Sequence, residues 1–288
     1  MPNPAITPPD DKHYENFPVA SWLCPPKFRA PIAAIYWFAR TADDLADEGN
    51  APPEQRLADL AAYRHDLQAA AQGQPASDRW GKVFAPLARA MTQFGLPLKL
   101  LTDLLDAFEQ DVHFTASGRR YVDDAELHDY CSRSANPVGR LLLHLYGIHD
   151  AASLAQSDQI CTALQLINFW QDVSVDVPRG RWYPSTAAMR RFDVKDADLQ
   201  ANGQSSNATK LIAAYAYSAR ATMLKGSQLA LTIPGRAGWE LRLVVQGGLR
   251  ILDKIEALNF ATWRTRPKLG PLDLPVLLWR ACRMQPEQ

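Results

Sequence analysis

The sequence predicts an all-α fold, and three observations support that prediction. Apolar residues recur at helical spacing along most of the 288 residues. Alternating polar and apolar residues, which would indicate strands, do not extend over a useful length. Clusters of proline and glycine divide the periodic segments into helix-sized lengths. We therefore expect a single helical domain over residues 16–288, preceded by a flexible arm over residues 1–15 that is rich in proline and acid.

The helices are expected in a definite order along the chain. The first begins after Pro25 and Pro26 and ends at Asp47, before a break at Gly49–Pro53. Pro31 fits this helix only if a segment restarts there, because an interior proline removes a backbone donor. The later helices are expected over residues 54–71, 83–94, 98–114, 125–146, 153–177, 210–232 and 236–260, with a last one after Pro271 that runs through Trp279.

The composition argues against several classes of protein. Hydrophobic residues make up 47% and charged residues 22%, and the net charge is zero without any block of Lys and Arg, so no nucleic-acid partner is expected. The N-terminus lacks the basic-then-apolar order of a signal peptide, and no apolar run reaches about 18 residues. We expect a cytoplasmic protein that is at most peripheral at the inner face of the membrane. The four scattered cysteines show no metal-ligand spacing and are expected to be buried free thiols: Cys24, Cys131, Cys161 and Cys282.

Oxygen-bearing side chains share one face of the stretch from Ala163 to Pro184. Asn168, Asp172 and Asp176 are four residues apart, so each step rotates by only about 40° around a helix. Two aromatic residues follow Asn168 directly. A polar face on so aromatic a helix indicates the wall of a cavity, and its buried oxygens require a cation to neutralise them.

A second acidic set ends the first expected helix. Asp43, Asp44 and Asp47 follow an apolar, aromatic run, and Arg40 stands one turn earlier on nearly the same face. Taken alone, four-spaced acids are as typical of a solvated helix face as of a metal site. Two such sets in one helical chain favour hard cations held between two helices. Carboxylate and amide oxygens are the ligands of Mg²⁺.

Basic residues near both acidic sets indicate an anionic substrate. Arg40, Arg179 and Arg181 could clamp a diphosphate, because a guanidinium group donates two parallel hydrogen bonds to phosphate oxygens. The alternative is that each of these arginines only pairs with the neighbouring aspartates.

A third stretch, from Tyr130 to Gly139, combines small residues with an Asn-Pro pair. Small residues would let a helix approach a long apolar ligand, and Pro137 should kink that helix. Tyr130 could orient a phosphate or face a carbocation with its ring. Interpreted from its residues alone, the stretch is better explained as a packing segment.

Together these motifs resemble those of the squalene/phytoene synthase family, the head-to-head prenyl synthases. The motifs keep the order and spacing that are typical of the family, and they extend from roughly Phe17 to Ile255. The resemblance implies an isoprenoid-synthase helical bundle with a central active-site cavity, Mg²⁺ as cofactor and a prenyl diphosphate as substrate. The matching motifs are Tyr36…Arg40…Asp43-Asp44-Leu45-Ala46-Asp47, Tyr130…Ala135…Val138-Gly139, Gln165-Leu166-Ile167-Asn168…Gln171-Asp172…Asp176 and Arg181-Trp182-Tyr183-Pro184.

Within the family, the chain is most similar to the bacterial hydroxysqualene synthases of hopanoid biosynthesis. Asn136 stands where many relatives have glycine, and Gln171 where many have arginine. The resemblance implies that presqualene diphosphate ionises, that its cation rearranges, and that water quenches it to hydroxysqualene. Asn136 is predicted to hold that water, and Gln171 is consistent with the handling of one diphosphate instead of two.

The resemblance also implies a role for each motif residue. The implied metal ligands are Asp43, Asp44, Asp47, Asn168, Asp172 and Asp176. The implied catalytic residues are Tyr36, Arg40, Tyr130 and Asn136. The implied substrate contacts are Arg40, Gln165, Gln171, Arg179, Arg181, Tyr183, Phe17, Phe169 and Trp170, and Phe108 is a further candidate for stabilising the cation with its ring.

Two other functions remain open at this point. One is a related synthase that condenses two prenyl diphosphates head-to-head to presqualene diphosphate, squalene or phytoene. The other is a non-catalytic helical assembly factor on the same fold, which would be expected to have lost the acidic ligands.

The implied partners follow from the same resemblance. A presqualene diphosphate synthase would supply the substrate, and a flavin-dependent reductase would consume the alcohol. Transient membrane contact could involve the arm before His13 or residues 267–279, although a packed terminal helix is the preferred interpretation of residues 267–279.

Overall fold

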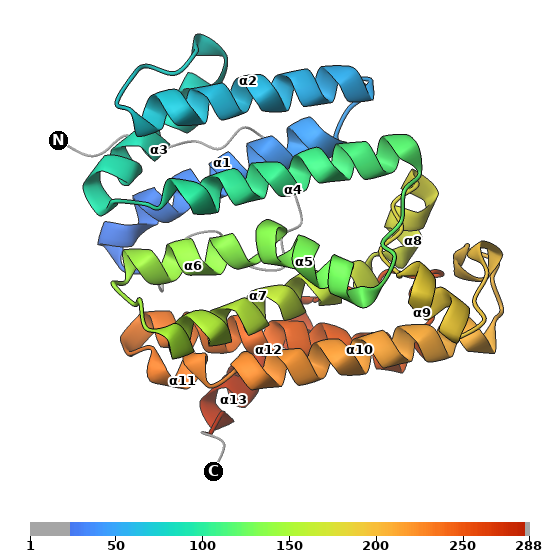
Figure 1. Ribbon diagram of the computed structural model, residues 1–288. Coiled ribbons are helices and arrows are strands. Elements are labelled where there is room, and N and C mark those ends of the chain that lie inside the picture. Colours follow the sequence, from blue (N-terminus) through green and yellow to red (C-terminus); the bar gives the residue numbers. More distant parts are fainter. Residues whose placement is uncertain (1–23, 286–288) are drawn as a thin grey trace.

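The structure is a computed structural model that describes residues 24–285, and every regular element in that part of the chain is helical (Figure 1). The predicted all-α fold is confirmed. The predicted arm over residues 1–15 lies outside the described residues. The α-helices are α1 Pro26–Asp47, α2 Pro53–Ala71, α3 Gly81–Phe94, α4 Leu98–Ser117, α5 Asp124–Ser134, α6 Asn136–Leu145, α7 Ala151–Gln171, α8 Val173–Asp176, α9 Thr186–Arg191, α10 Ser206–Gly226, α11 Leu229–Thr232, α12 Gly235–Ala257 and α13 Leu274–Arg283, with 3-10 turns at Asp78–Trp80, Val177–Arg179, Asp196–Leu199 and Pro271–Asp273.

The expected helix over residues 153–177 is interrupted at Asp172. Helix α7 ends at Gln171, Asp172 adopts φ −100° and ψ 12°, and α8 follows as a single turn. The cause is a tertiary contact, because the amide of Ser174 donates to the carbonyl oxygen of Thr262 at 3.2 Å instead of continuing the helical bonding. No proline or glycine marks this interruption, so local sequence signals could not predict it.

Two further expected helices are divided, whereas the first one is not. The helix over residues 125–146 divides at Ala135, where φ is −120° and ψ is −48°, and Pro137 lies in the first turn of α6, in agreement with the predicted kink. The helix over residues 210–232 divides after Gly226 into α10 and α11. Helix α1 instead passes through Pro31 without a restart. The carbonyl group left without its helical donor belongs to Lys27, which is exposed in the first turn.

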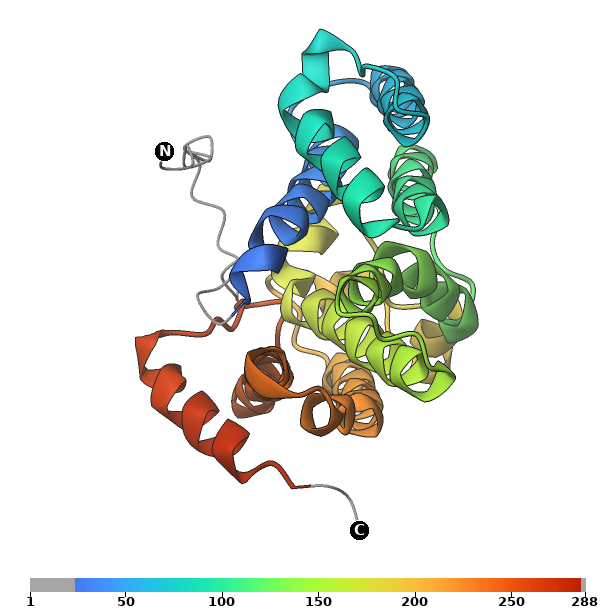
Figure 2. The same ribbon diagram turned by 90° about the vertical axis from the view of Figure 1, so that its left-hand side faces the viewer.

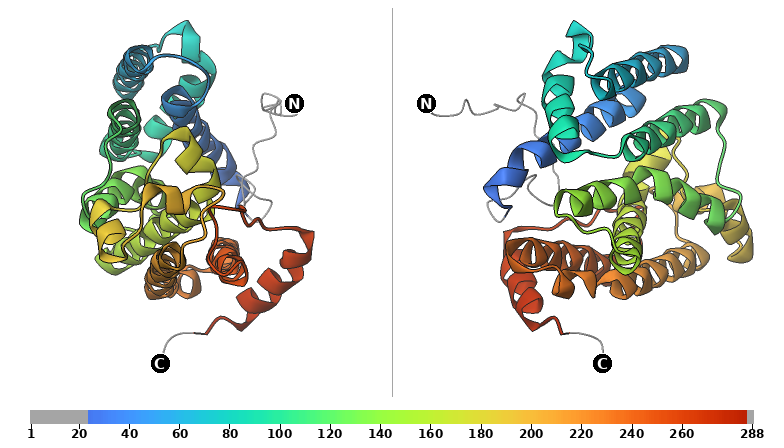
Figure 3. Two further views of the ribbon diagram at one scale, coloured as in Figure 1. Left: turned by 90° about the vertical axis from the view of Figure 1, so that its right-hand side faces the viewer. Right: turned by 60° about the vertical axis from the view of Figure 1, so that its left-hand side comes forward.

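Two hydrophobic clusters hold the helices in layers (Figure 1). Helices α1 to α4 and α6 contribute to one cluster, which includes the buried Phe38 and Leu104. Helices α5, α7, α10 and α12 contribute to the other, which includes Ile167, Ile212 and Leu252. The first acidic set lies on α1 and the second on α7 and α8, so the two sets come from the two layers that adjoin here (Figure 3).

Helix α7 is held in place by a very close contact with α10. A Cβ atom added to Gly226 of α10 would lie 2.5 Å from the backbone carbonyl oxygen of Gln156 on α7 and 2.8 Å from a side-chain carbon of Ile160. Only a residue without a side chain permits this approach. The helix that carries the second acidic set is therefore positioned by backbone contact.

Helix α13 lies on the outside of α12, at the edge of the molecule (Figure 2). Between residues 24 and 285, no helix is both long and apolar enough to cross a bilayer. All four cysteines are free thiols, and Cys24 and Cys131 are buried as predicted. Cys161 is only partly buried and Cys282 is exposed on α13, so the prediction of burial is wrong for the last of them.

Candidate active site

A cavity of about 750 Å³ lies between the two layers of helices. Its size falls within the range of about 300–1,000 Å³ that is usual for small-molecule sites. Helices α1, α4, α5, α7 and α8 and the segments that follow α8 and α12 contribute its walls. The predicted site residues that line it are Tyr36, Arg40, Asp43, Asp47, Tyr130, Gln165, Asn168, Phe169, Asp172, Asp176, Arg179, Arg181 and Tyr183, together with Phe108.

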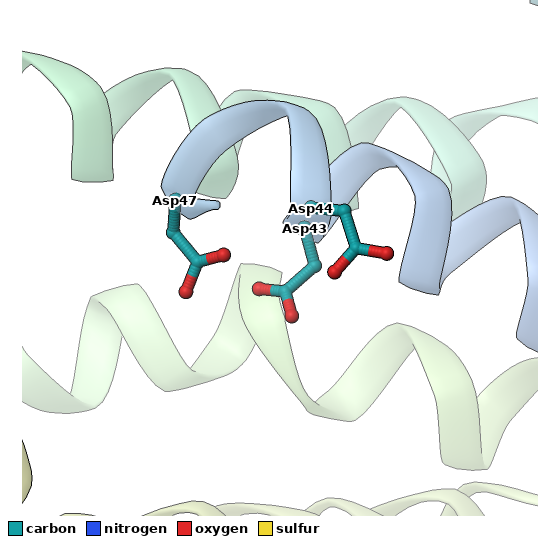
Figure 4. A group of neighbouring side chains, drawn as sticks. All are labelled: Asp43, Asp44 and Asp47. Carbon is teal, nitrogen blue, oxygen red and sulfur yellow. The ribbon is translucent and has the colours of Figure 1, made fainter. Parts of the chain in front are cut away.

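The last two turns of α1 present the first acidic set. Figure 4 shows Asp43 and Asp47 extending from the same side of the helix, with Asp44 beside them. One carboxylate oxygen from each of the three lies within 4.8 Å of the others. Burial, together with the neighbouring charge of Asp47, raises the pKa of Asp43 to about 7. The carboxyl groups are therefore crowded, and a bound cation would relieve their mutual repulsion.

The second acidic set lies on the opposite wall, at the junction of α7 and α8. Asn168, Asp172 and Asp176 all line the cavity even though the helix is interrupted between them. Arg266 donates to both carboxylate oxygens of Asp172, from Nε at 2.5 Å and from Nη2 at 2.9 Å. Burial raises the pKa of Asp176 to about 7, with a further contribution from the charge of Asp172.

Arginines connect the two acidic sets. Arg181 lies after α8, and its Nη2 donates to Oδ2 of Asp47 on α1 at 2.7 Å. Arg40 contacts Asp43 at 3.2 Å and Asp44 at 2.5 Å within α1. Oδ1 of Asp47 is buried without a hydrogen-bond partner among the described residues. Both sequence interpretations of these arginines are therefore compatible with the structure, because they pair with aspartates and also line the cavity.

An aromatic wall lies beside the acidic sets. The rings of Phe169 and Tyr183 stack with centroids 3.6 Å apart, and Tyr121 stacks against Tyr183 at 6.3 Å. The hydroxyl group of Tyr130 donates to Oδ2 of Asp111 at 2.6 Å. Burial raises the pKa of Asp111 to about 7. This wall combines π-faces, which can face a cation, with one buried carboxyl group.

Three predicted site residues are packed between helices and do not line the cavity. Gln171 is buried on α7, and its Nε2 donates to the carbonyl oxygen of Pro267 at 2.7 Å. Trp170 stacks on Tyr215 of α10 with centroids 4.0 Å apart. Oδ1 of Asn136 accepts a hydrogen bond from Thr162 Oγ1 at 2.9 Å, as expected of a packing residue. The structure therefore places these three side chains in contacts that hold helices together, away from the cavity where the predicted roles would require them.

Two other predicted site residues, Asp44 and Phe17, are not among the residues that line the described cavity. Asp44 does not line the cavity and instead contacts Arg40. Phe17 lies outside the described residues. Gly139 approaches Ser157 and Cys161 of α7, so the small residue serves helix packing.

Several cavity residues were missed by reasoning from the sequence. Asp111 had a usable signal: it follows the buried Phe108 by three residues, so helical spacing puts an acid on the buried face of α4. Arg266 and Lys268 lie in an irregular segment after α12 and had no such signal. Other lining residues that were missed include Phe114, Thr115, Arg119, Tyr121 and Trp182.

Known proteins show clear similarity to this chain. It is 35% identical over 200 residues to the hydroxysqualene synthase of Sinorhizobium fredii, an alignment covering 66% of this chain and 64% of that protein. It is 28% identical over 255 residues to the presqualene diphosphate synthase of Rhodopseudomonas palustris, covering 88% of both. Alignments with the hydroxysqualene synthases of Rhodopseudomonas palustris and Zymomonas mobilis span about half of those proteins, 51% of each.

The fold is also that of solved relatives. The crystal structure of squalene synthase HpnC from Alicyclobacillus acidocaldarius matches with a TM-score of 0.77 and 33% identity, covering 86% of this chain and 90% of that one. The family model for squalene/phytoene synthases matches residues 11–273, which include every acidic and basic cavity residue described above. This chain therefore belongs to the squalene/phytoene synthase family.

Proposed function

We propose that this chain is a hydroxysqualene synthase that ionises presqualene diphosphate and quenches the rearranged cation with water. The observation that carries the proposal is that two acidic sets, from α1 and from α7 with α8, face one cavity beside an aromatic wall. Its similarity to hydroxysqualene synthases and to squalene synthase HpnC supports the same reaction. The alcohol product would need a separate flavin-dependent reductase to become squalene.

The donor set of this site fits Mg²⁺. The three acids of α1 bring carboxylate oxygens within 4.8 Å of one another, and Oδ1 of Asp47 is a buried acceptor without a partner among the described residues. Asp43, Asp47, Asn168, Asp172 and Asp176 would hold the metal, with Asp44 next to them. Oxygen-only donors of this kind suit hard divalent cations. Bound Mg²⁺ supplies Lewis-acid stabilisation of the departing diphosphate.

Basic side chains of the chain would bind the leaving diphosphate directly. Arg40, Arg181 and Arg266 line the cavity and end next to the acidic sets, with Lys268 beside them. Their planar guanidinium groups are suited to phosphate oxygens. Each of these arginines is paired with an aspartate in the structure, so the pairs would open when the aspartates bind the metal and the guanidinium groups bind phosphate oxygens. Tyr36 and Tyr130 contribute further polar groups to the same wall.

The aromatic wall would stabilise the carbocation and restrict access of water. Phe169, Tyr183 and Tyr121 present stacked rings, and cation–π attraction is strong where water is excluded. Since Asn136 does not line the cavity, we propose that Tyr130 and Asp111 hold the quenching water. The water oxygen bonds to the cationic carbon, and its surplus proton passes to the Asp111 carboxylate.

A specific observation favours a second candidate, a presqualene diphosphate synthase. The alignment with the enzyme of that name covers 88% of both chains, although the identity is only 28%. Such an enzyme would join two farnesyl diphosphates in the same cavity. Because the acidic sets are intact, a non-catalytic assembly factor is less consistent with the site.

Product analysis by mass spectrometry separates these functions. The protein is incubated with Mg²⁺ and either presqualene diphosphate or farnesyl diphosphate alone. We expect hydroxysqualene and diphosphate from presqualene diphosphate, and no turnover of farnesyl diphosphate. Conversion of farnesyl diphosphate alone to presqualene diphosphate would instead establish the second candidate. No diphosphate release from either substrate would refute both.

A further inference from the structure

Helix α13 presents an unusual surface, because its solvent-facing side is apolar. Leu274, Leu278 and Trp279 are exposed at 55%, 46% and 58%, and Leu272 just before the helix is almost fully exposed. We call the exposed residues Leu272, Leu274, Pro275, Leu278, Trp279 and Cys282 the α13 patch. Monomeric soluble proteins rarely leave neighbouring large apolar side chains in water without a function.

The helix packs on the protein by a different face. Leu277 and Ala281 are its buried residues, and they lie one turn apart on the side toward α12. At 100° per residue, the exposed positions 274, 275, 278, 279 and 282 fall together within an arc of about 140°. The preferred sequence interpretation, a packed terminal helix, is therefore incomplete: one face is packed and the other is apolar and uncovered among the described residues.

A net positive charge lies beside the α13 patch. Arg280 of α13 pairs with Asp253 of α12 at 2.6 Å, and the buried Asp273 pairs with Arg250 at 2.8 Å and Lys254 at 2.7 Å. Arg220 also pairs with Asp253, so these two acids are shared by four cations. The guanidinium of the exposed Arg283 lies over the Trp279 ring and adds a further positive charge, so cations remain in excess after pairing. This excess complements an anionic surface.

The α13 patch follows the cavity wall closely in the chain. Arg266 and Lys268 line the cavity, and the 3-10 turn that leads into α13 begins only three residues later, at Pro271. We propose that the α13 patch docks this protein on the surface of a lipid bilayer that contains anionic lipids. An amphipathic helix with leucine and tryptophan on one side and arginine at its edge binds at that interface. The reason for such docking rests on the proposed function, because substrate and product are long hydrocarbons that dissolve in lipid.

A second copy of this chain is a poorer occupant of the same surface. A symmetric dimer would place the α13 patch of one copy against that of the other, and with it the same basic residues, including Arg283. The excess positive charge of the two copies would then meet, because Asp253 and Asp273 are already paired with cations of their own copy. An anionic bilayer satisfies both the apolar residues and the charges.

Vesicle co-sedimentation of the full chain tests the proposal without substrate. The probe is vesicles of equal parts phosphatidylcholine and phosphatidylglycerol, compared with vesicles of phosphatidylcholine alone. The patch variant is Leu278→Gln with Trp279→Gln. The control is Leu224→Gln with Trp239→Gln, because these side chains are exposed at 43% and 41% on other helices. The tryptophans of the two variants are well matched. The guanidinium carbon of Arg242 lies 4.7 Å from the ring centroid of Trp239, and that of Arg283 lies 4.5 Å from the ring centroid of Trp279.

We expect the unaltered chain and the control to bind anionic vesicles, and the patch variant to bind about tenfold more weakly. Arg283→Gln should weaken binding to anionic vesicles about fivefold and leave binding to neutral vesicles unchanged. Equal binding of patch and control variants would overturn the proposal, as would no vesicle binding by the unaltered chain. A patch variant that changes the oligomeric state in light scattering would identify a second copy as the occupant and would also overturn it. The patch variant should release diphosphate from detergent-dispersed presqualene diphosphate as fast as the unaltered chain does. Vesicle binding therefore tests the docking proposal, and diphosphate release tests the proposed reaction independently.

Discussion

Arg181 and Asp47 lie 134 positions apart in the chain, and Nη2 of Arg181 donates to Oδ2 of Asp47 at 2.7 Å. This contact joins the segment after the second acidic set to the last turn of α1, which carries the first set. Burial and the charge of Asp47 act in opposite directions on Arg181, and the net effect raises the pKa of its guanidinium. The two acidic sets therefore share a permanently positive group as well as a cavity.

Arg181→Gln should impair catalysis much more than folding. The variant removes a cationic donor from the site of the leaving diphosphate, and such a loss costs about 10²–10³ in rate. We expect kcat/KM for presqualene diphosphate to fall by about that factor. Arg190→Gln on α9 is the control, because Arg190 is exposed and does not line the cavity. A change of less than about threefold for Arg181→Gln would contradict the assigned role.

Mg²⁺ should stabilise the protein more at pH 8 than at pH 6. Burial raises the pKa of both Asp43 and Asp176 to about 7, whereas an unfolded aspartate has a pKa of about 3.9. Between these values the folded state binds more protons than the unfolded state, so the free energy of unfolding falls as pH rises toward 7. Mg²⁺ competes with those protons. Thermal melts with and without Mg²⁺ should show the larger increase of Tm at pH 8, and equal increases at both pH values would count against the metal site.

Gln171→Ala and Gln165→Ala should separate packing from substrate contact. Gln171 donates to the Pro267 carbonyl in a buried position, so its loss should lower the free energy of unfolding by about 1–3 kcal/mol. Gln165 lines the cavity, so its loss should raise KM while leaving stability nearly unchanged. Urea unfolding and steady-state kinetics of both variants check this. The opposite pattern would restore Gln171 as a substrate residue.

Gly226→Ala should destabilise the fold, because the added Cβ would lie 2.5 Å from the backbone carbonyl oxygen of Gln156. Overpacking of this kind costs about 1–3 kcal/mol. Gly81→Ala is the control, because a Cβ there meets nothing within 4 Å. Urea unfolding of the two variants measures the difference. Equal stability would mean that α7 and α10 separate easily, and that the second acidic set is less rigidly positioned than we describe.

Much of the site could be predicted from the sequence because its determinants are local. The aspartates at positions 43 and 47 are four residues apart, as are Asn168 and Asp172. Residues at this spacing lie on the same face of a helix. The helix boundaries of α1 and α2 follow from prolines and glycines. These features need no knowledge of tertiary contacts.

The remainder depends on contacts between distant segments. Arg266 reaches Asp172 across 94 positions from an irregular loop, and no spacing or composition marks it. The interruption of α7 at Asp172 arises from the bond between Ser174 and Thr262, which local signals do not encode. Gln171 and Trp170 lie away from the cavity for a related reason. Neighbouring residues on one helix point in different directions, and only packing decides which of them faces the cavity.

Anomalous diffraction from crystals grown with Mn²⁺ and inorganic diphosphate tests the central claim most directly. The account predicts Mn²⁺ peaks in the cavity that are bound by Asp43 or Asp47 on one side and by Asn168, Asp172 or Asp176 on the other, with diphosphate between them and next to Arg181. Mn²⁺ confined to the protein surface, or diphosphate bound away from both acidic sets, would contradict it.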